Sequence, residues 1–190
     1  MATATLPFLT PEEYLALERV ADRRSEYING QMYAMAGGSE THARIISNIH
    51  GSLYNQLDGS GCDVFTNDFR VQSLGRKVYT YPDVVVFCAP ASFLDGHRDT
   101  ITDATLIIEV LSPSTKNYDR GEKFQYYRSL PSFAEYLLVH QDSLYVEHFT
   151  RRPDGTWIFQ EHASAADDIE LPSLGCKLSL DRIYNRVDFF

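Results

Sequence analysis

Two acidic residues lie in segments that otherwise have the composition of buried β-strands. Asp83 follows Pro82 directly before the apolar residues 84–87, and Glu109 lies in the middle of the run 106–111. An ionised carboxylate among apolar groups is destabilising unless it is paired or binds a metal. Mg²⁺ prefers oxygen ligands and commonly takes one or two carboxylates together with water and phosphate oxygens. If the two strands are neighbours, Asp83 and Glu109 predict a site for Mg²⁺ or Mn²⁺.

Each of these acids also has a purely structural interpretation. Asp83 could accept hydrogen bonds from backbone N–H groups at the start of a strand, and Glu109 could belong to a buried ion pair. The following segment carries a cation, Lys123, four residues after Asp119. Residues four apart in a helix also pair on solvent-exposed faces, so spacing alone leaves the role of Lys123 open.

The chain has the length and composition of one folded domain. It contains 190 residues, of which 44% are hydrophobic and 13% aromatic. We therefore expect a single domain over residues 1–190, with its core at about 39–140. No apolar stretch approaches the length of a membrane span, and the first residues lack the features of a signal peptide. The net charge of −9 is unfavourable for nucleic-acid binding, which normally requires an excess of basic residues.

The cysteines indicate a reducing compartment. Cys62, Cys88 and Cys176 are odd in number, widely spaced and without a Cys-x-x-Cys motif. This pattern argues against a disulfide framework and against a zinc site, and it predicts a cytoplasmic location.

Local signals predict the elements that must position the acids. A capping box at residues 10–13 begins a helix that extends to about residue 20. Asn29-Gly30 is typical of a two-residue hairpin turn, and Ser39 can cap a second helix, which ends near residue 57. The remaining elements are expected to be strands at 63–72, 78–88 and 105–111, a helix at 117–129, a strand at 135–140, a hairpin of 143–149 with 157–162, and an edge segment at 171–180. This order favours an α/β (α+β) fold in which helices flank a mixed β-sheet.

The order of elements and the motifs resemble those of the PD-(D/E)XK nuclease superfamily. Its core is a helix, three strands, a helix and a strand, with Pro-Asp at the second strand and Glu-x-Lys on the third. More narrowly, the chain resembles the Uma-type family of restriction endonucleases. The segments that carry this resemblance are residues 10–14, 26–30, 38–42, 81–85, 108–115, 119–123 and 133–139.

The resemblance implies a restriction-endonuclease-like core and a Mg²⁺- or Mn²⁺-dependent endonuclease that hydrolyses DNA phosphodiester bonds. Asp83 and Glu109 are then the metal ligands. Leu111 stands where the motif lysine belongs, and the family resemblance makes Lys123 the catalytic replacement. Cutting both strands of a duplex needs two sites, so a homodimer is expected.

Four further residues are candidates for the edge of this site. Glu26 could supply a third acidic group or cap a turn. His42 shares a helix face with apolar residues and could equally be a histidine at the edge of the core. Asp119 and Arg120 lie on the same predicted helix as Lys123, and the guanidinium of Arg120 is suited to holding a phosphate.

Two other functions remain open. The fold could serve as a non-catalytic module that binds nucleic acid or protein, which the acidic net charge and Leu111 favour. Alternatively, Asp83 and Glu109 could act as the acid and base of a glycosidase. The single Trp in the chain, with no aromatic cluster near either acid, argues against sugar binding.

Overall fold

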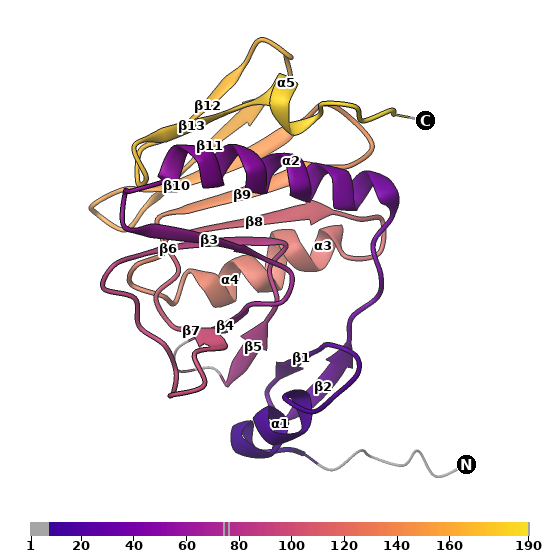
Figure 1. Ribbon diagram of the computed structural model, residues 1–190, viewed down its shortest axis with the longest axis vertical. Helices are drawn as coiled ribbons and strands as arrows, with labels where there is room; N and C mark the ends of the chain where they lie inside the picture. The colour runs from indigo at the N-terminus through magenta and orange to yellow at the C-terminus, as the bar shows by residue number, and fades with distance from the viewer. Residues whose placement is uncertain (1–7, 74, 76, 190) are drawn as a thin grey trace.

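The computed structural model describes residues 8–73, 75 and 77–189 (Figure 1). Helix α1 (Pro11–Glu18) begins with the predicted capping box, in which Thr10 and Glu13 exchange side-chain to backbone hydrogen bonds. Strands β1 (Ser25–Ile28) and β2 (Gln31–Ala34) form the predicted hairpin. Asn29 and Gly30 both have positive φ angles, 48° and 95°, as a type I′ turn requires.

A six-stranded mixed sheet forms the centre of the molecule, in the order β11-β10-β9-β8-β6-β3. Strands β8 and β9 are parallel, and the other neighbours are antiparallel. The crossover between β8 and β9 is helical, which parallel neighbours require. It consists of α3 (Lys116–Tyr118), the π-helical turn η1 (Asp119–Lys123) and α4 (Phe124–Tyr127). The strands are β3 (Cys62–Thr66), β6 (Val84–Cys88), β8 (Leu106–Leu111), β9 (Glu135–His140), β10 (Val146–Arg151) and β11 (Trp157–His162).

A second sheet has the order β2-β1-β5-β4-β7 and joins the hairpin to the rest of the chain. It adds β4 (Arg70–Ser73), β5 (Val78–Thr80) and β7 (Thr100–Ile101). The predicted strands 63–72 and 78–88 are therefore wrong as continuous strands, because each divides between the two sheets. The breaks fall at Asn67, whose φ of 39° is left-handed, and at Pro82, which has no N–H to donate to a ladder.

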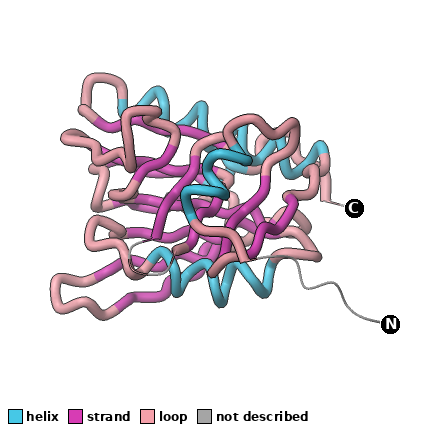
Figure 2. Tube along the Cα trace, turned by 90° about the horizontal axis from the view of Figure 1, so that it is seen from below, coloured by secondary structure: helices cyan, strands magenta, loops and turns pink. Residues whose placement is uncertain are grey.

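Helices cover both faces of the central sheet (Figure 2). Helix α2 (Glu40–Leu57) packs on one face together with β12 (Asp168–Leu171), β13 (Cys176–Ser179) and α5 (Leu180–Ile183). The expected C-terminal edge segment is wrong, since β12 and β13 form a two-stranded sheet of their own. On β8, Ile108 and Val110 face the α2 side, whereas Ile107 and Leu111 belong to the core on the α3–α4 side. Side chains alternate along a strand, so Glu109 points toward the helix that carries Lys123.

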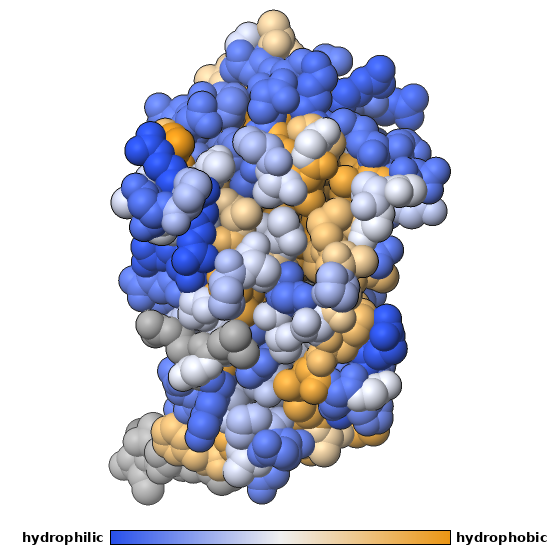
Figure 3. Space-filling view, turned by 90° about the vertical axis from the view of Figure 1, so that its left-hand side faces the viewer, coloured by the Kyte–Doolittle hydropathy of each residue, from blue (hydrophilic) through white to orange (hydrophobic). Residues whose placement is uncertain are grey.

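The face that lies to the left in Figure 1 carries an apolar band. Figure 3 shows this band between polar flanks. Apolar atoms make up more than half of an ordinary protein surface, so this band by itself indicates no function. Within the described part of the chain, no helix is long and apolar enough to cross a membrane.

The prediction that the cysteines stay unpaired is wrong. Cys62 and Cys88 lie directly opposite each other in the β3–β6 pairing and form a disulfide, and Cys176 is free. Opposition across a sheet depends on strand register, which cysteine spacing does not reveal. The cysteines therefore do not indicate a reducing compartment, because disulfides persist mainly in oxidising compartments.

We expect one reactive thiol per chain in the unfolded, unreduced protein and three after reduction. The bond spans a sequence separation of 26 residues, so its reduction should lower the free energy of unfolding by about 3 kcal/mol. Thiol titration and denaturation with and without reductant measure both effects. Three reactive thiols before reduction would contradict the pairing.

A second prediction concerns Glu135, at the start of β9. Its side chain is fully buried, Oε1 accepts a hydrogen bond from the Ser173 N–H at 3.0 Å, and Oε2 has no hydrogen-bond partner. Burial raises the pKa of Glu135 to about 7. A carboxyl group whose pKa is higher in the folded than in the unfolded protein stabilises the fold fully at pH values below its unfolded-state pKa, which is near 4.5. This stabilisation is lost as the pH rises through the folded-state pKa of about 7.

Glu135→Gln should therefore gain stability relative to wild type as the pH rises from about 4.5 to 8, by about 3 kcal/mol at most. Urea denaturation of both proteins across this range measures the difference. His148 Nε2 lies 4.0 Å from Glu135 Oε2, and burial lowers the pKa of His148 to about 4. His148 is therefore neutral in the folded protein over most of this pH range, and the pH dependence that distinguishes the two proteins comes from Glu135. A difference that does not change with pH would show that Glu135 is ionised in the folded protein.

Candidate active site

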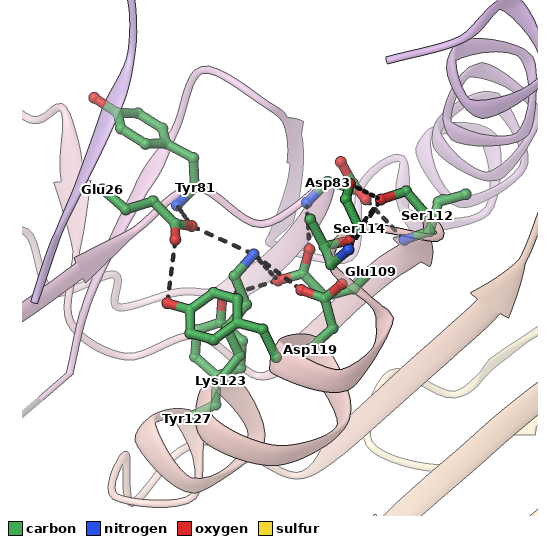
Figure 4. A network of polar contacts seen from close by, with 12 residues as sticks. Glu26, Tyr81, Asp83, Glu109, Ser112, Ser114, Asp119, Lys123 and Tyr127 are labelled. Carbon is green, nitrogen blue, oxygen red and sulfur yellow. Dashed lines mark hydrogen bonds and ion pairs between the residues drawn. The ribbon is translucent and has the colours of Figure 1, made fainter. Parts of the chain in front are cut away.

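Asp83 and Glu109 lie side by side (Figure 4). Asp83 directly precedes β6, and the pairing of Val84 with Ile108 places it opposite Glu109 of β8. The Asp83 N–H donates to Glu109 Oε2 at 3.4 Å, and Asp83 Oδ2 accepts from the Val110 N–H at 2.7 Å. Asp83 thus makes the backbone contact that its structural interpretation anticipated, while its carboxylate remains beside that of Glu109.

Lys123 lies among three carboxylates. Its Nζ is 3.1 Å from Glu109 Oε1, 3.3 Å from Glu26 Oε1 and 3.4 Å from Asp119 Oδ1. The ion pair with Asp119 exists, but on a buried rather than a wet helix face, since only 8% of the Lys123 side chain is exposed. Residues from β1, β8 and η1 therefore meet at one ammonium group.

Tyrosines complete the contacts of these acids. Tyr127 OH donates to Glu109 Oε1 at 2.9 Å, and Tyr118 OH donates to Glu26 Oε2 at 3.2 Å. Glu26 Oε1 also accepts from the Tyr81 N–H at 3.2 Å. Tyr127 is not among the residues that the sequence predicts for this site. The available signal was its spacing, because it follows Lys123 by four residues and so lies on the same side of the helix.

His42 reaches the site from the first turn of α2, which Ser39 caps. Its Nε2 lies 3.2 Å from Asp83 Oδ2 and 3.1 Å from the Val110 carbonyl oxygen. Burial lowers the pKa of His42, but the contacts with Asp83 outweigh it and the net shift is upward. His42 thus holds the Asp83 carboxylate in place.

Arg120 does not reach these residues. Its Nε donates to Glu147 Oε1 at 2.8 Å, and one terminal nitrogen lies 2.9 Å from His140 Nε2. Successive residues of a helix point in different directions around its axis, and Arg120 faces away from the side that Asp119 and Lys123 share.

The cluster holds more acid than its lysine can balance. Burial raises the pKa of Glu109 well above its usual range, with the charge of Lys123 opposing the shift, and burial also raises that of Asp119. For Lys123, burial lowers the pKa, but the surrounding carboxylates, Glu109 first, outweigh it and raise it well above its ordinary value. A further cation beside these carboxylates would stabilise the site.

These residues line a cleft of about 620 Å³. One wall is the segment that joins the hairpin to α2, which rises on the right of Figure 1. The opposite wall comes from the end of β8 and the loop that follows it. The lining includes Glu26, Tyr33, residues 34–39, His42, Asp83, Glu109, Ser112, Ser114, Thr115, Tyr118, Asp119, Glu122, Lys123 and Gln141.

A family model described as "Uma2: Putative restriction endonuclease" matches residues 11–182, most of the chain. The chain belongs to the Uma2 family. It is 39% identical over 187 residues to "Uncharacterized protein slr1290" of Synechocystis, covering 98% of this chain and 97% of that protein. It is also 35% identical over 170 residues to "Uncharacterized protein sll1609" of the same organism, covering 90% of this chain and 96% of that protein.

A solved structure shares the fold of this Uma2 protein. It is described as a putative nuclease belonging to DUF820 from Anabaena variabilis. The two superpose with a TM-score of 0.74 at 17% sequence identity, covering 93% of this chain and 97% of the other. The mixed sheet with flanking helices is thus the restriction-endonuclease-like fold, as the resemblance led us to expect.

This Uma2 site offers few side-chain oxygens. It therefore suits an ion such as Mg²⁺ or Mn²⁺, which keeps water ligands, better than a metal that is bound by protein side chains alone. Among the described residues, no three His, Cys, Asp or Glu side chains form a ready metal cage. Mg²⁺ needs only one or two carboxylates, with water and phosphate supplying the rest. Asp83 and Glu109 provide those carboxylates, and the buried Asp119 Oδ1 beside them makes no hydrogen bond, although it forms the 3.4 Å ion pair with Lys123.

Proposed function

We propose that this protein is a metal-dependent endonuclease that hydrolyses DNA phosphodiester bonds, with Asp83 and Glu109 holding Mg²⁺ or Mn²⁺. The observation that carries the proposal is the contact of Asp83 with Glu109 in one cleft, with the buried Lys123 3.1 Å from Glu109. The family description and the Anabaena neighbour's description support nuclease activity in general.

Each residue of the site has a separate role in the proposed hydrolysis. A divalent ion at Asp83 and Glu109 would supply a Lewis acid that polarises the scissile phosphate and lowers the pKa of an attacking water. In hydrolysis, the water oxygen bonds to phosphorus as the bond from phosphorus to the leaving oxygen breaks. The Lys123 ammonium is positioned to offset the negative charge that builds up on the phosphate. His42 orients Asp83 through its 3.2 Å contact, and Tyr127 orients Glu109.

A DNA substrate has consequences for the oligomeric state and for the location of the protein. Cutting both strands at one place needs two copies of the site, so we propose a homodimer for that outcome. We also propose the cytoplasm as the place of action, because the DNA of bacteria such as Synechocystis, the source of the two relatives, is there; the Cys62–Cys88 bond lends this location no support.

The proposal predicts that divalent ions control both binding and cleavage. At a net charge of −9 the protein repels DNA at long range, and a cation in the cleft removes part of this repulsion. We expect affinity for DNA to rise about tenfold between chelator and Ca²⁺ at fixed ionic strength, and cleavage to require Mg²⁺ or Mn²⁺. Cleavage that persists in chelator would overturn the metal-dependent mechanism.

The second candidate is a non-catalytic binding module on the same fold. It is favoured by Leu111, which occupies the place of the motif lysine, and by Lys123, which is already paired with three carboxylates. Calorimetric titration with Mn²⁺ separates the two functions, because a binding module need not take up the ion. Absence of both ion uptake and cleavage would favour the module.

A further inference from the structure

Tyr33 stands at the mouth of the cleft with its ring accessible. It lies directly opposite Glu26 in the β1–β2 pairing, and directly opposed residues in a sheet project from the same face. Glu26 reaches Lys123, so Tyr33 faces the same cleft and is among its lining residues. It is 48% exposed, which leaves an aromatic surface beside the candidate active site.

The acids themselves are recessed. The exposed fraction of the side chain is 14% for Asp83, 3% for Glu109 and 8% for Lys123. A phosphate must therefore enter the cleft to meet them. The cleft volume of about 620 Å³ is in the range of pockets that hold a small ligand. DNA duplex is stiff over many base pairs, whereas an unpaired strand can turn its backbone into such a space.

The charges of the cleft also disfavour a duplex. Among the described residues, its lining contains five acids and one lysine, with no arginine. Duplex binding normally neutralises several phosphates with Lys and Arg. The rim instead offers hydroxyl groups, which can donate hydrogen bonds to a phosphate without carrying charge. They belong to Ser39, Ser112, Ser114 and Thr115.

We propose that the strand cut by this protein is unpaired where it crosses the cleft, with one of its bases stacked on the ring of Tyr33. This rests on the proposed nuclease function and names the form of its substrate. Stacking on an aromatic side chain tolerates any base and contributes about 1–3 kcal/mol per base. It supplies affinity that the acidic cleft cannot obtain from phosphates.

The test uses one labelled oligodeoxynucleotide sequence in three forms: single-stranded, fully paired, and paired with a central unpaired bubble. Cleavage is measured in Mn²⁺ and binding in Ca²⁺, both at fixed ionic strength. We expect the single strand and the bubble to be cut at least about tenfold faster than the full duplex. Equal or faster cutting of the full duplex would overturn the inference.

Variants of Tyr33 test the stacking contact. Tyr33→Ala should weaken binding of the single strand in Ca²⁺ about tenfold, and Tyr33→Phe should retain it. The matched control is Tyr54→Ala on α2, which removes a tyrosine that is 64% exposed and does not line this cleft. Equal losses for Tyr33→Ala and Tyr54→Ala, or no loss for Tyr33→Ala, would contradict the contact.

The same measurements separate this inference from the nuclease proposal. If no form is cut in Mn²⁺ but single-strand binding in Ca²⁺ still depends on Tyr33, the catalytic function fails and the unpaired-strand site stands. If the full duplex is cut and Tyr33 is irrelevant, the nuclease stands and this inference fails.

Discussion

Asp83→Asn and Glu109→Gln are each expected to lower the affinity for Mn²⁺ at least about 100-fold and to reduce cleavage to roughly a thousandth. Both changes keep the size of the side chain and remove its charge. The two carboxylates lie together, one just before β6 and one on β8, so either change halves the charged ligands available to the ion. Calorimetric titration with Mn²⁺ measures the first effect, and cleavage at saturating Mn²⁺ measures the second.

For Glu109, substitution by glutamine is a better test than substitution by alanine. Its carboxylate accepts hydrogen bonds from Lys123, Tyr127 and the Asp83 N–H. Glu109→Ala would take this acceptor from the Tyr127 hydroxyl and the Asp83 N–H and one of three carboxylates from Lys123, which would destabilise the fold. Asp142→Asn is a suitable control, because that carboxylate is 75% exposed and outside the cleft. Unchanged Mn²⁺ affinity in both test variants would exclude a metal site at Asp83 and Glu109.

Lys123→Met should lower turnover about 100- to 1,000-fold while Mn²⁺ affinity is kept or raised. The variant loses the group that offsets phosphate charge, and it also removes a cation that competes with the metal for Glu109. Without metal, three buried carboxylates are left unbalanced, which should cost about 3 kcal/mol of stability. Mn²⁺ should restore much of that loss, so denaturation with and without the ion provides a measurement independent of activity.

Arg120→Ala is the matched control for Lys123→Met. Arg120 is on the same helical segment but bonds to Glu147 and His140 away from the cleft. We therefore expect its removal to leave turnover and Mn²⁺ affinity unchanged. Full cleavage by Lys123→Met at saturating Mn²⁺ would show that another group offsets the charge and that Lys123 serves only the folded structure.

Much of the fold is predictable because its signals are local. The capping box at Thr10, the Asn29-Gly30 turn and the cap at Ser39 each depend on residues within one turn of the chain, and the structure has all three. The two long strands were predicted wrongly because apolar composition does not show where a chain passes from one sheet to another. The disulfide was missed for a similar reason, since it depends on the β3–β6 register.

The candidate site was likewise predictable only in part. Asp83 and Glu109 were recognisable as acids in apolar runs, and alternation along β8 explains why Glu109 faces the helix of Lys123. Arg120, another candidate, contacts Glu147 and His140 instead, because neighbouring residues of a helix point in different directions around its axis. Tyr33 was not considered, although the predicted two-residue turn at Asn29-Gly30 already implies that it pairs with Glu26.

The attachment of the N-terminal hairpin has a consequence for how the protein folds. Glu26 contacts Tyr81 and Tyr118, which are 55 and 92 residues away in sequence, and β1 joins β5 through two residue pairs. Contacts between distant residues carry a large loop-closure cost and tend to form late. We therefore expect Lys123 to meet its neighbours on β8 and η1 before it meets Glu26. A nascent chain would then complete its charge cluster, and the wall that carries Tyr33, only at the end of folding, so that partly folded molecules would have no closed cleft for the proposed reaction.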